Sequence, residues 1–306
     1  GIIGCGPIGC ELGQSFSIFG SKVTMIDLLP RILAKEDSEA ANIVHKSMQN
    51  CGVNFVLGAR VVGVENCNGD QIKVELSNGK QYIFSHLLVV TGRKPNVENM
   101  DLELANVKYD TVNGIFIDDF CQTSNPNIYG AGDCCNKFQF THMVDSMAKI
   151  VVPNALFYAK KRVSSLIIPW CTYTFPQVAH VGLYERDLKD RNIEYDVRVS
   201  ALENNGRAIC DGTDIDKGFV KIFTLKDTDK ILGATIVSEN AGDQISEINV
   251  AISNNIGLSG INRTMHPYPT IAESIKYVSD GYIGGQNEKL RPLFEKILAK
   301  RLSSKL

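Results

Sequence analysis

The first nine residues read as an apolar strand that runs into a glycine loop, and no other segment constrains the fold as strongly. The loop has the spacing G-x-G-x-x-G, with Gly4, Gly6 and Gly9 as its glycines, and a helical stretch follows over residues 10–19. The first glycine of such a loop allows a tight turn, the second lets the backbone approach a pyrophosphate, and the third lets helix and strand pack closely. Free N–H groups at the helix start attract phosphate oxygens. The segment therefore predicts a phosphate-binding loop.

A second apolar run over residues 22–26 ends on Asp27 and completes a βαβ dinucleotide-binding pattern. An acid at this position accepts hydrogen bonds from the ribose hydroxyls of the adenosine and repels a 2′-phosphate. The pattern therefore predicts binding of NAD in preference to NADP. Arg31, only four residues further on, weakens that preference.

Size and composition are those of an ordinary globular protein with two or three domains. The chain has 306 residues, of which 44% are hydrophobic and 22% charged, and a formal net charge of −2. This charge argues against a general partner among nucleic acids or membrane surfaces, and no apolar run reaches the roughly 18 residues of a membrane span. The nine cysteines show no zinc-type or disulfide-scaffold spacing. We therefore expect a reducing, intracellular compartment and no metal site.

Up to about residue 94, strands and helices alternate in the βαβ manner. A helix over 37–50 leads to a strand over 53–57, and a hairpin with an Asn-Gly turn follows over 73–84. The continuously apolar run at 86–90 predicts a strand at a buried central position of a parallel sheet.

The chain then changes character twice. Residues 91–96 are rich in turn formers and predict a crossing between domains. A shorter middle part follows over 95–165, with a helix expected over 143–162. From residue 166 onward the pattern is typical of an α+β domain on an antiparallel sheet, with strands at 218–223 and 231–237 and helices at 241–254 and 270–278.

Five sequence blocks occur in the same order as in one known family: the glycine loop with Glu11, and the segments 91–96, 123–133, 176–183 and 266–273. Together they resemble the pyridine nucleotide–disulfide oxidoreductase flavoenzymes, which include dihydrolipoamide dehydrogenase, glutathione reductase and mercuric reductase. The resemblance implies an α/β fold with a Rossmann-like NAD(P)-binding domain over 1–94. It implies the C-terminal part of a FAD-binding domain over 95–165 and an α+β dimerisation domain over 166–306. Nothing in the chain resembles the family's N-terminal FAD half-domain with its C-x4-C redox pair, so we expect an N-terminally truncated member.

The resemblance also implies binding roles for single residues. Gly92 and Arg93 lie in the family's linker signature, and Gly132 and Asp133 lie in its second flavin motif, where Asp133 would hold the ribityl chain of FAD. Glu11 would lie near the nicotinamide, between NAD and flavin. Judged without the resemblance, Asp133 could instead cap the next helix, and Glu11 could complement the dipole of the helix from its first turn.

Cys5 and Cys10 have the C-x4-C spacing of a redox pair. Cys5 occupies the variable position between two glycines, and we expect Cys10 to point from the first helical turn towards the packed side. We therefore interpret this spacing as an accident of the glycine loop, without a redox role.

The block at 266–273 departs from the disulfide-reducing members, which carry His-x-His-Pro-Thr and a following Glu. Aligned on Pro269, Thr270 and Glu273, this chain has Tyr268 at the position of their catalytic His. Tyrosine titrates near pH 10 and is a poor base at neutral pH, but it can donate a hydrogen bond or bind a soft ion beside thiolates. The tyrosine resembles mercuric reductase, whose C-terminal vicinal cysteines are absent from this tail. Tyr268 and Glu273 are the candidate catalytic residues, and the alternative is that they only pack at a subunit interface.

The resemblance implies a homodimer that passes electrons from NAD(P)H through FAD to a cysteine pair, and then to a disulfide or another small-molecule acceptor. Each protomer would lend Tyr268 and Glu273 to its partner's active site. Two alternatives are a flavin-dependent NADH oxidase or diaphorase without a thiol relay, and a catalytically silent dimeric homologue. We expect no disulfide reductase activity from this chain alone. The last residues, Ser304, Lys305 and Leu306, match a peroxisomal address; otherwise we expect the cytoplasm or the mitochondrion.

Overall fold

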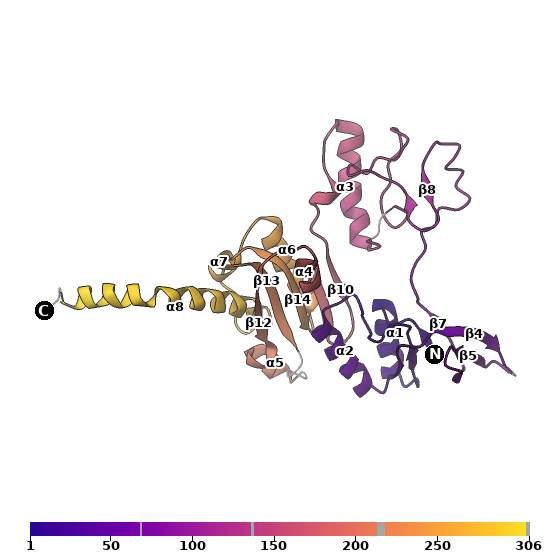
Figure 1. The fold of residues 1–306 in the computed structure, drawn as a ribbon, viewed down its shortest axis with the longest axis horizontal. Helices are drawn as coiled ribbons and strands as arrows, with labels where there is room; N and C mark the ends of the chain where they lie inside the picture. Colours follow the sequence, from indigo (N-terminus) through magenta and orange to yellow (C-terminus); the bar gives the residue numbers. More distant parts are fainter. Residues whose placement is uncertain (68, 136–137, 213–217, 304–306) are drawn as a thin grey trace. The chain divides into compact units, whose positions relative to one another are not determined.

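The computed structural model describes residues 1–67, 69–135, 138–212 and 218–303 (Figure 1). The chain forms two compact units: residues 1–91 together with 169–306, and residues 92–168. The expected domain boundaries at 94 and 165 stay predictions. The tripeptide that resembles a peroxisomal address lies outside the described residues.

A parallel sheet in the order β3-β2-β1-β7 forms the N-terminal part of the larger unit. Its strands are β1 (Ile2–Ile3), β2 (Thr24–Ile26), β3 (Asn54–Val56) and β7 (Leu88–Val89), and its helices are α1 (Pro7–Ile18) and α2 (Ser38–Asn50). β1 pairs in parallel with both β2 and β7. The expected βαβ arrangement is therefore confirmed, with the glycine loop between β1 and α1.

β7 lies at the end of this sheet and not at its centre, so this expectation was wrong. Among the described strands it pairs with β1, and the side chain of Val89 is 59% exposed. Leu88 and Val90 do pack against the core around α1 and α2. The strand is covered on one face only, although every residue from 87 to 90 is apolar.

An antiparallel sheet of three strands is inserted before β7. It contains β4 (Val61–Asn66), β5 (Ile72–Leu76) and β6 (Gln81–Phe84), in that order. The hairpin expected over 73–84 is confirmed, and Gly79 adopts the left-handed φ of +78° that its turn requires.

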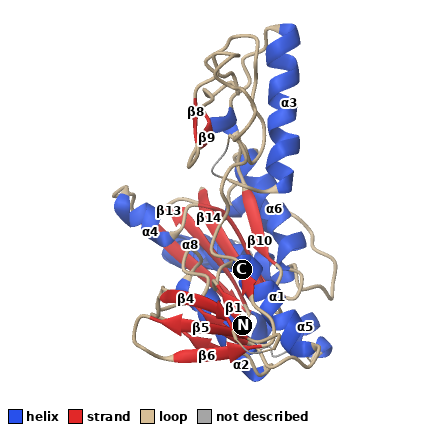
Figure 2. Ribbon diagram, turned by 90° about the vertical axis from the view of Figure 1, so that its right-hand side faces the viewer, coloured by secondary structure: helices blue, strands red, loops and turns tan. Residues whose placement is uncertain are grey.

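The C-terminal part of the larger unit is built on a five-stranded antiparallel sheet in the order β10-β11-β14-β13-β12 (Figure 2). The strands are β10 (Pro169–Thr172), β11 (Gln177–Gly182), β12 (Tyr195–Ala201), β13 (Phe219–Leu225) and β14 (Ile231–Ser238). The helices are α4 (Glu185–Asp190), η2 (Leu202–Asn204), α5 (Gly206–Asp211), α6 (Ala241–Ser253), α7 (Leu258–Asn262) and α8 (Glu273–Ser303). The expected α+β domain is confirmed: α6 and α8 bury Ile248 and Ile275 in one core with Ile222 and Ile236 of the sheet.

α8 is far longer than the helix expected over 270–278. Ile275, Val278 and Tyr282 are buried against the sheet domain, whereas every residue from 287 to 303 is exposed. Figure 1 shows this last part of the helix running away from the sheet. The apolar residues Leu290, Leu293, Phe294, Ile297, Leu298 and Leu302 recur on it at helical spacing and are 45–58% exposed.

The smaller unit consists of α3 (Thr141–Phe157), η1 (Val163–Ser165) and a two-stranded sheet of β8 (Tyr109–Asp110) and β9 (Gly114–Ile115). Met143, Met147 and Ile150 of α3 pack with Val97 and Ile115. The helix expected over 143–162 ends earlier, because Tyr158 adopts a left-handed φ of +54°. The buried Asn154 side chain then binds the backbone N–H and carbonyl of Lys161 and turns the chain back.

Candidate functional site

The glycine loop is close-packed at its first and third glycines. Gly4 has a φ of +110°, and a Cβ there would lie 2.6 Å from the carbonyl oxygen of Val90. A Cβ on Gly9 would lie 2.0 Å from the carbonyl oxygen of Gly4. Both positions therefore exclude any side chain, in agreement with the turn and the helix–strand packing expected from the sequence.

Gly6 differs from its two neighbours because nothing lies within 4 Å of the position that its Cβ would occupy. It is the N-cap residue of α1, and its φ of −75° is open to any residue. Pro7 follows at the first helical position, where a missing N–H costs nothing. The N–H groups of Ile8 and Gly9 belong to the first helical turn, which has no intrahelical acceptors. The loop thus offers open space beside a helix N-terminus, as a pyrophosphate requires.

Asp27 lies at the end of β2, directly beside this loop. Its Oδ2 accepts a hydrogen bond from the Cys5 N–H at 2.6 Å, and its Oδ1 accepts one from the Leu29 N–H at 2.8 Å. An ionised carboxylate has about four acceptor sites, so two remain for ribose hydroxyls. The structure therefore brings Gly4, Gly6, Gly9 and Asp27 into one site, and their role in binding NAD remains a prediction.

Arg31 follows Asp27 in the segment that leads to α2, and its guanidinium is turned onto the backbone of that segment. Nη2 donates to the carbonyl oxygens of Ala34 at 2.8 Å and Glu36 at 3.2 Å. Nη1 donates to Glu36 at 3.3 Å and to Asp37 at 3.4 Å. The arginine is half-buried, and both of its terminal nitrogens donate within its own segment.

Glu11 lies in the second turn of α1 and not in the first, because the helix begins at Pro7. Its Oε1 accepts a hydrogen bond from the Tyr173 N–H at 2.8 Å. The proposed dipole role at the helix start is therefore wrong, and the carboxylate instead joins α1 to the segment after β10. Its expected place near a nicotinamide is a prediction.

Cys5 and Cys10 are both buried. Burial and the neighbouring Asp27 carboxylate raise the pKa of the Cys5 thiol to about 12. Burial likewise raises the pKa of Cys10, together with the nearby Cys5 and Glu11. Because the thiolate is the reactive form, both thiols are protonated and unreactive at neutral pH, which supports the interpretation that their spacing has no redox meaning.

The smaller unit brings together two residues that the resemblance assigns to cofactor binding. Arg93 Nη1 lies 3.8 Å from Asp133 Oδ2, and both side chains are 52% exposed. Arg93 also donates to the carbonyl oxygen of Gln139 at 3.0 Å. The linker signature and the second flavin motif therefore meet, with a carboxylate that is open to a hydroxyl-bearing ligand.

Arg93 and Asp133 each follow a glycine whose backbone conformation favours glycine. Gly92 has a φ of +139° and Gly132 a φ of +88°, and a Cβ on Gly132 would lie 2.9 Å from Val144 Cγ2. Asp133 does not cap the following helix, because the N-cap residue of α3 is Phe140. The helix-capping interpretation of Asp133 is therefore wrong.

The C-terminal block places Tyr268 and Glu273 in different environments. Tyr268 is 77% exposed, whereas Glu273 is 8% exposed at the start of α8. Glu273 Oε2 accepts a hydrogen bond from the Thr270 N–H at 3.3 Å. His266 matches the first His of the His-x-His-Pro-Thr pattern, and its Nε2 lies 2.9 Å from Glu247 Oε1. The exposed tyrosine is therefore presented on a loop that buried polar groups hold in place.

Asn205 holds the same loop and was not found from the sequence. It is fully buried, and its Nδ2 donates to the Thr270 carbonyl at 3.1 Å and to Ser274 Oγ at 3.0 Å. Its Oδ1 caps α5. A Cβ on Gly206 would lie 3.6 Å from the Tyr268 hydroxyl. The only available signal was an Asn-Gly pair before a short helical stretch, which also marks ordinary turns.

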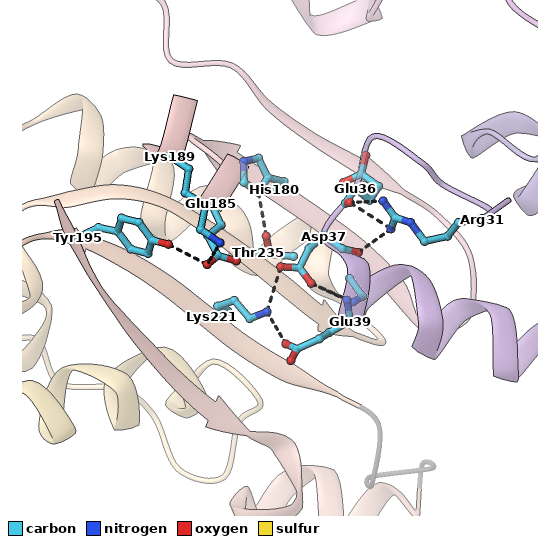
Figure 3. Close-up of polar contacts among 11 residues, drawn as sticks. Arg31, Glu36, Asp37, Glu39, His180, Glu185, Lys189, Tyr195, Lys221 and Thr235 are labelled. Carbon is cyan, nitrogen blue, oxygen red and sulfur yellow. Dashed lines mark hydrogen bonds and ion pairs between the residues drawn. The ribbon is translucent and has the colours of Figure 1, made fainter. Parts of the chain in front are cut away.

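A buried polar cluster, which no sequence pattern predicts, joins the segment before α2 to the five-stranded sheet (Figure 3). Trp170 Nε1 donates to Glu36 Oε1 at 3.0 Å, and the Tyr184 hydroxyl donates to Glu36 Oε2. Lys221 Nζ lies 3.0 Å from Asp37 Oδ2 and also contacts Glu39. These contacts fix the entrance of α2 to the C-terminal sheet.

His180 lies in the same cluster, stacked on Tyr184 with ring centroids 3.5 Å apart. Its Nδ1 is 2.9 Å from Thr235 Oγ1. Burial lowers the pKa of His180 to about 3. The ring is therefore neutral in the folded protein at any physiological pH.

In the described part of the chain, no group of three His, Cys, Asp or Glu side chains is placed to hold a metal ion. No helix there is both long and apolar enough to cross a membrane.

Comparison with protein families matches most of the chain to one family. A model of the pyridine nucleotide-disulphide oxidoreductases matches residues 1–148. A model of the pyridine nucleotide-disulphide oxidoreductase dimerisation domain matches residues 168–278. Members of this family use FAD and NAD(P)H.

Relatives of known function agree. The chain is 37% identical over 280 residues to a mercuric reductase of Lysinibacillus sphaericus, covering 90% of this chain and 50% of the relative. It is 33% identical over 279 residues to a dihydrolipoyl dehydrogenase of Cupriavidus necator, covering 90% of this chain and 58% of the relative. The chain therefore spans about half the length of the curated relatives that it matches.

Solved structures share the fold. LpdA of Mycobacterium tuberculosis superposes with a TM-score of 0.85 at 25% identity, over 92% of this chain and 61% of LpdA. The HOCl-induced flavoprotein disulfide reductase RclA of Escherichia coli gives 0.84 at 23% identity, over 91% of this chain and 63% of RclA, a likeness of fold alone. A Rossmann-type domain and a C-terminal dimerisation domain in a mixed α/β fold are thus confirmed. The chain belongs to the pyridine nucleotide-disulphide oxidoreductase family.

Proposed function

We propose that the intact protein is a FAD-dependent oxidoreductase that takes electrons from NADH and delivers them to a disulfide or another small acceptor. The electrons would pass through FAD and a redox cysteine pair that this chain does not contain. The glycine loop is the observation that carries the proposal. It is close-packed at Gly4 and Gly9 and open at Gly6, beside a carboxylate that retains free acceptor sites.

The residues of the chain fit both cofactors. The open face of Gly6 and the first turn of α1 suit a pyrophosphate, and Asp27 suits the ribose of NADH. Asp133, half-exposed beside Arg93, suits a polyol hydroxyl such as those of a ribityl chain. A bound flavin supplies the capacity to accept a hydride from a nicotinamide. The protein residues bind and orient, which accounts for a large share of the rate of such a transfer.

Tyr268 is proposed to act at the acceptor end of the reaction. It is the most exposed polar side chain of the C-terminal block, and its loop is held by Glu273 and Asn205. By the family's architecture, a homodimer would place it in the partner's active site. As a phenol it donates a hydrogen bond, and it replaces the histidine that serves as a base in disulfide-reducing members.

The tyrosine also motivates a second candidate, a flavin-dependent NADH oxidase or diaphorase without a thiol relay. A chain without the histidine base lacks the group that moves a proton to and from a thiolate. A third candidate is a catalytically silent dimer that has kept the fold. A purified intact protein without flavin absorbance would favour this last candidate.

NADH titration of this chain, followed by nicotinamide fluorescence, tests the nucleotide site. Saturable binding is expected, and Asp27→Ala should weaken it at least tenfold, about 1.4 kcal/mol. Asp70→Ala, at an exposed acid in the β4–β5 connection, is the matched control and should leave affinity unchanged. No saturable NADH binding at millimolar concentration would refute the proposal.

The acceptor is tested in the intact protein by steady-state NADH oxidation with a disulfide and with oxygen alone. Disulfide-dependent turnover that falls in Tyr268→Phe supports the thiol relay. Turnover that needs only oxygen and ignores this substitution supports the oxidase. The chain of 306 residues by itself is expected to reduce no disulfide, because it contains no C-x4-C pair other than the buried Cys5 and Cys10.

A further inference from the structure

Arg31 and Lys35 are the only cations between the ribose acid Asp27 and the start of α2. In dinucleotide-binding folds, an arginine close to this acid is the group that accommodates the 2′-phosphate of NADP. The direction in which Arg31 points therefore decides whether the site can accept NADPH. Lys35 is exposed and provides an internal comparison.

The guanidinium of Arg31 points into its own segment. It makes four hydrogen bonds of 2.8–3.4 Å to the carbonyl oxygens of Ala34, Glu36 and Asp37. Figure 3 shows Arg31 engaged with Glu36 and Asp37. The flanking backbone is fixed as well, since Ile32 and Leu33 are buried and the Leu33 N–H donates to the Cys5 carbonyl at 2.9 Å.

Residues 35–37, two of which provide carbonyls to Arg31, are in turn held by the C-terminal sheet domain through the Glu36 and Asp37 side chains and the Lys35 carbonyl. The Glu36 side chain is buried and accepts hydrogen bonds from Trp170 and Tyr184. Arg186 donates to the Lys35 carbonyl. The Lys221 ammonium pairs with Asp37. Three parts of that domain, β10, α4 with its N-cap, and β13, thus grip the segment from 35 to 37.

Releasing Arg31 towards a ligand would break these bonds. Hydrogen bonds from a charged donor are stronger than those between neutral groups, and the carbonyls of Ala34, Glu36 and Asp37 would lose that donor. A 2′-phosphate would also meet the Asp27 carboxylate, which repels it. Both effects disfavour NADPH, and the first depends on residues more than a hundred positions away.

We propose that the dimerisation domain makes this site selective for NADH by holding the Arg31 guanidinium on the carbonyls of Ala34, Glu36 and Asp37, where it is withheld from a 2′-phosphate. Arg31 then determines specificity because its guanidinium is bound to these carbonyls. Glu36, Trp170 and Tyr184 are positioning residues that act through Arg31. The proposal rests on the proposed function, because the loop must bind NADH for a preference to exist.

The test measures dissociation constants for NADH and NADPH in parallel. NADH is expected to bind at least tenfold more tightly. Arg31→Gln should leave the NADPH constant within about twofold, because the guanidinium does not contribute to it. A tenfold loss of NADPH affinity in Arg31→Gln with unchanged NADH affinity would overturn the proposal, since Arg31 would then already reach the 2′-phosphate.

The second part of the test removes the contacts that hold residues 35–37 on the C-terminal domain. Glu36→Ala removes the anchor, and Tyr184→Phe removes one donor to it with less disturbance of packing. Both should raise the affinity for NADPH relative to NADH, by about fivefold or more in Glu36→Ala. Adding Arg31→Gln to either variant should cancel the gain, whereas adding Lys35→Gln should not. A ratio that stays constant in both release variants contradicts the proposal.

The ratio separates this mechanism from simple damage, because a distorted site loses both ligands together. It also separates the two proposals. No NADH binding at all refutes the nucleotide site itself. NADH binding with equal NADPH affinity, or with a preference that the release variants leave unchanged, refutes only the role given to Arg31.

Discussion

Lys221, on β13, places its Nζ 3.0 Å from Oδ2 of Asp37, the residue that caps α2 184 positions earlier in the chain. Both side chains are only 10% exposed. Asp37 uses its other oxygen to accept hydrogen bonds from the Glu39 and Ala40 N–H groups. The Asp37 carboxylate therefore caps α2 and also pairs with a buried cation of the five-stranded sheet.

Replacing Lys221 by Met should lower the free energy of unfolding by about 2–4 kcal/mol, because it leaves the Asp37 charge buried without its partner. Lys226→Met is the control: its Nζ lies 3.4 Å from Asp196 but is half-exposed, and such pairs contribute about 0–1 kcal/mol. Urea denaturation of both variants measures the difference. Equal losses would show that the Asp37 pair is no stronger than a surface contact.

Alanine at two glycines of the loop should separate binding from stability. Gly6→Ala meets open space and a compatible φ of −75°, and because Ala is a poorer N-cap residue than Gly the fold should lose at most about 1 kcal/mol, while NADH affinity falls at least tenfold. Gly9→Ala would place its Cβ 2.0 Å from a carbonyl oxygen and should destabilise by about 1–3 kcal/mol. Thermal melts and NADH titrations test both. Unchanged NADH affinity in Gly6→Ala would argue against the loop as the pyrophosphate site.

His180 should make stability depend on pH. Burial lowers its pKa to about 3 in the folded chain, against about 6.5 when unfolded. Between these values the unfolded chain binds the proton and the folded chain does not, so stability is lost as the pH falls below about 6.5. The slope from this one residue reaches about 1.4 kcal/mol per pH unit. His180→Asn should flatten the dependence of unfolding free energy on pH between 6 and 4, and parallel curves for both proteins would refute the assignment.

Asn205→Ala removes the cap of α5 and the donors to the Thr270 carbonyl and Ser274. Because buried acceptors lose their partners, we expect a loss of about 2–4 kcal/mol. Asn205→Asp keeps the cap but turns a carboxylate oxygen, which cannot donate, towards the buried Thr270 carbonyl, and should cost at least as much. The neighbouring Asn204 is exposed, and Asn204→Ala should stay within about 0.5 kcal/mol. Chemical denaturation compares the three, and equal costs for Asn204→Ala and Asn205→Ala would be inconsistent with the structure.

The glycine loop could be predicted from the sequence because its geometry is local. The close approaches at Gly4 and Gly9 arise within the loop and the strands beside it, and glycine is the residue type that permits them. The hairpin with Gly79 is equally local. By contrast, the apolar run of β7 shows a preference for burial but does not show which strands are its neighbours, and the edge position with Val89 exposed could not be derived from it.

The buried polar contacts could not be predicted for a related reason. Charged residues are mostly exposed, so nothing in the sequence marks Glu36, Asp37 or Lys221 as buried partners. Their burial follows from the packing of α2 and the segment before it on the five-stranded sheet, between residues nearly two hundred positions apart. The resemblance assigned Arg93 and Asp133 to cofactor binding one by one, and the pairing of their side chains was not predicted.

The two ends of α8 should differ in their dynamics. A helix end without a packed face is marginal in water, and local opening there needs little free energy. Amide hydrogens from about 287 to 303 should therefore exchange with solvent almost freely, whereas those around Ile275 and Val278 should exchange only when the sheet domain unfolds. Amide exchange along this one helix should therefore range from that of a frayed peptide at its C-terminal end to that of the domain core at its N-terminal end.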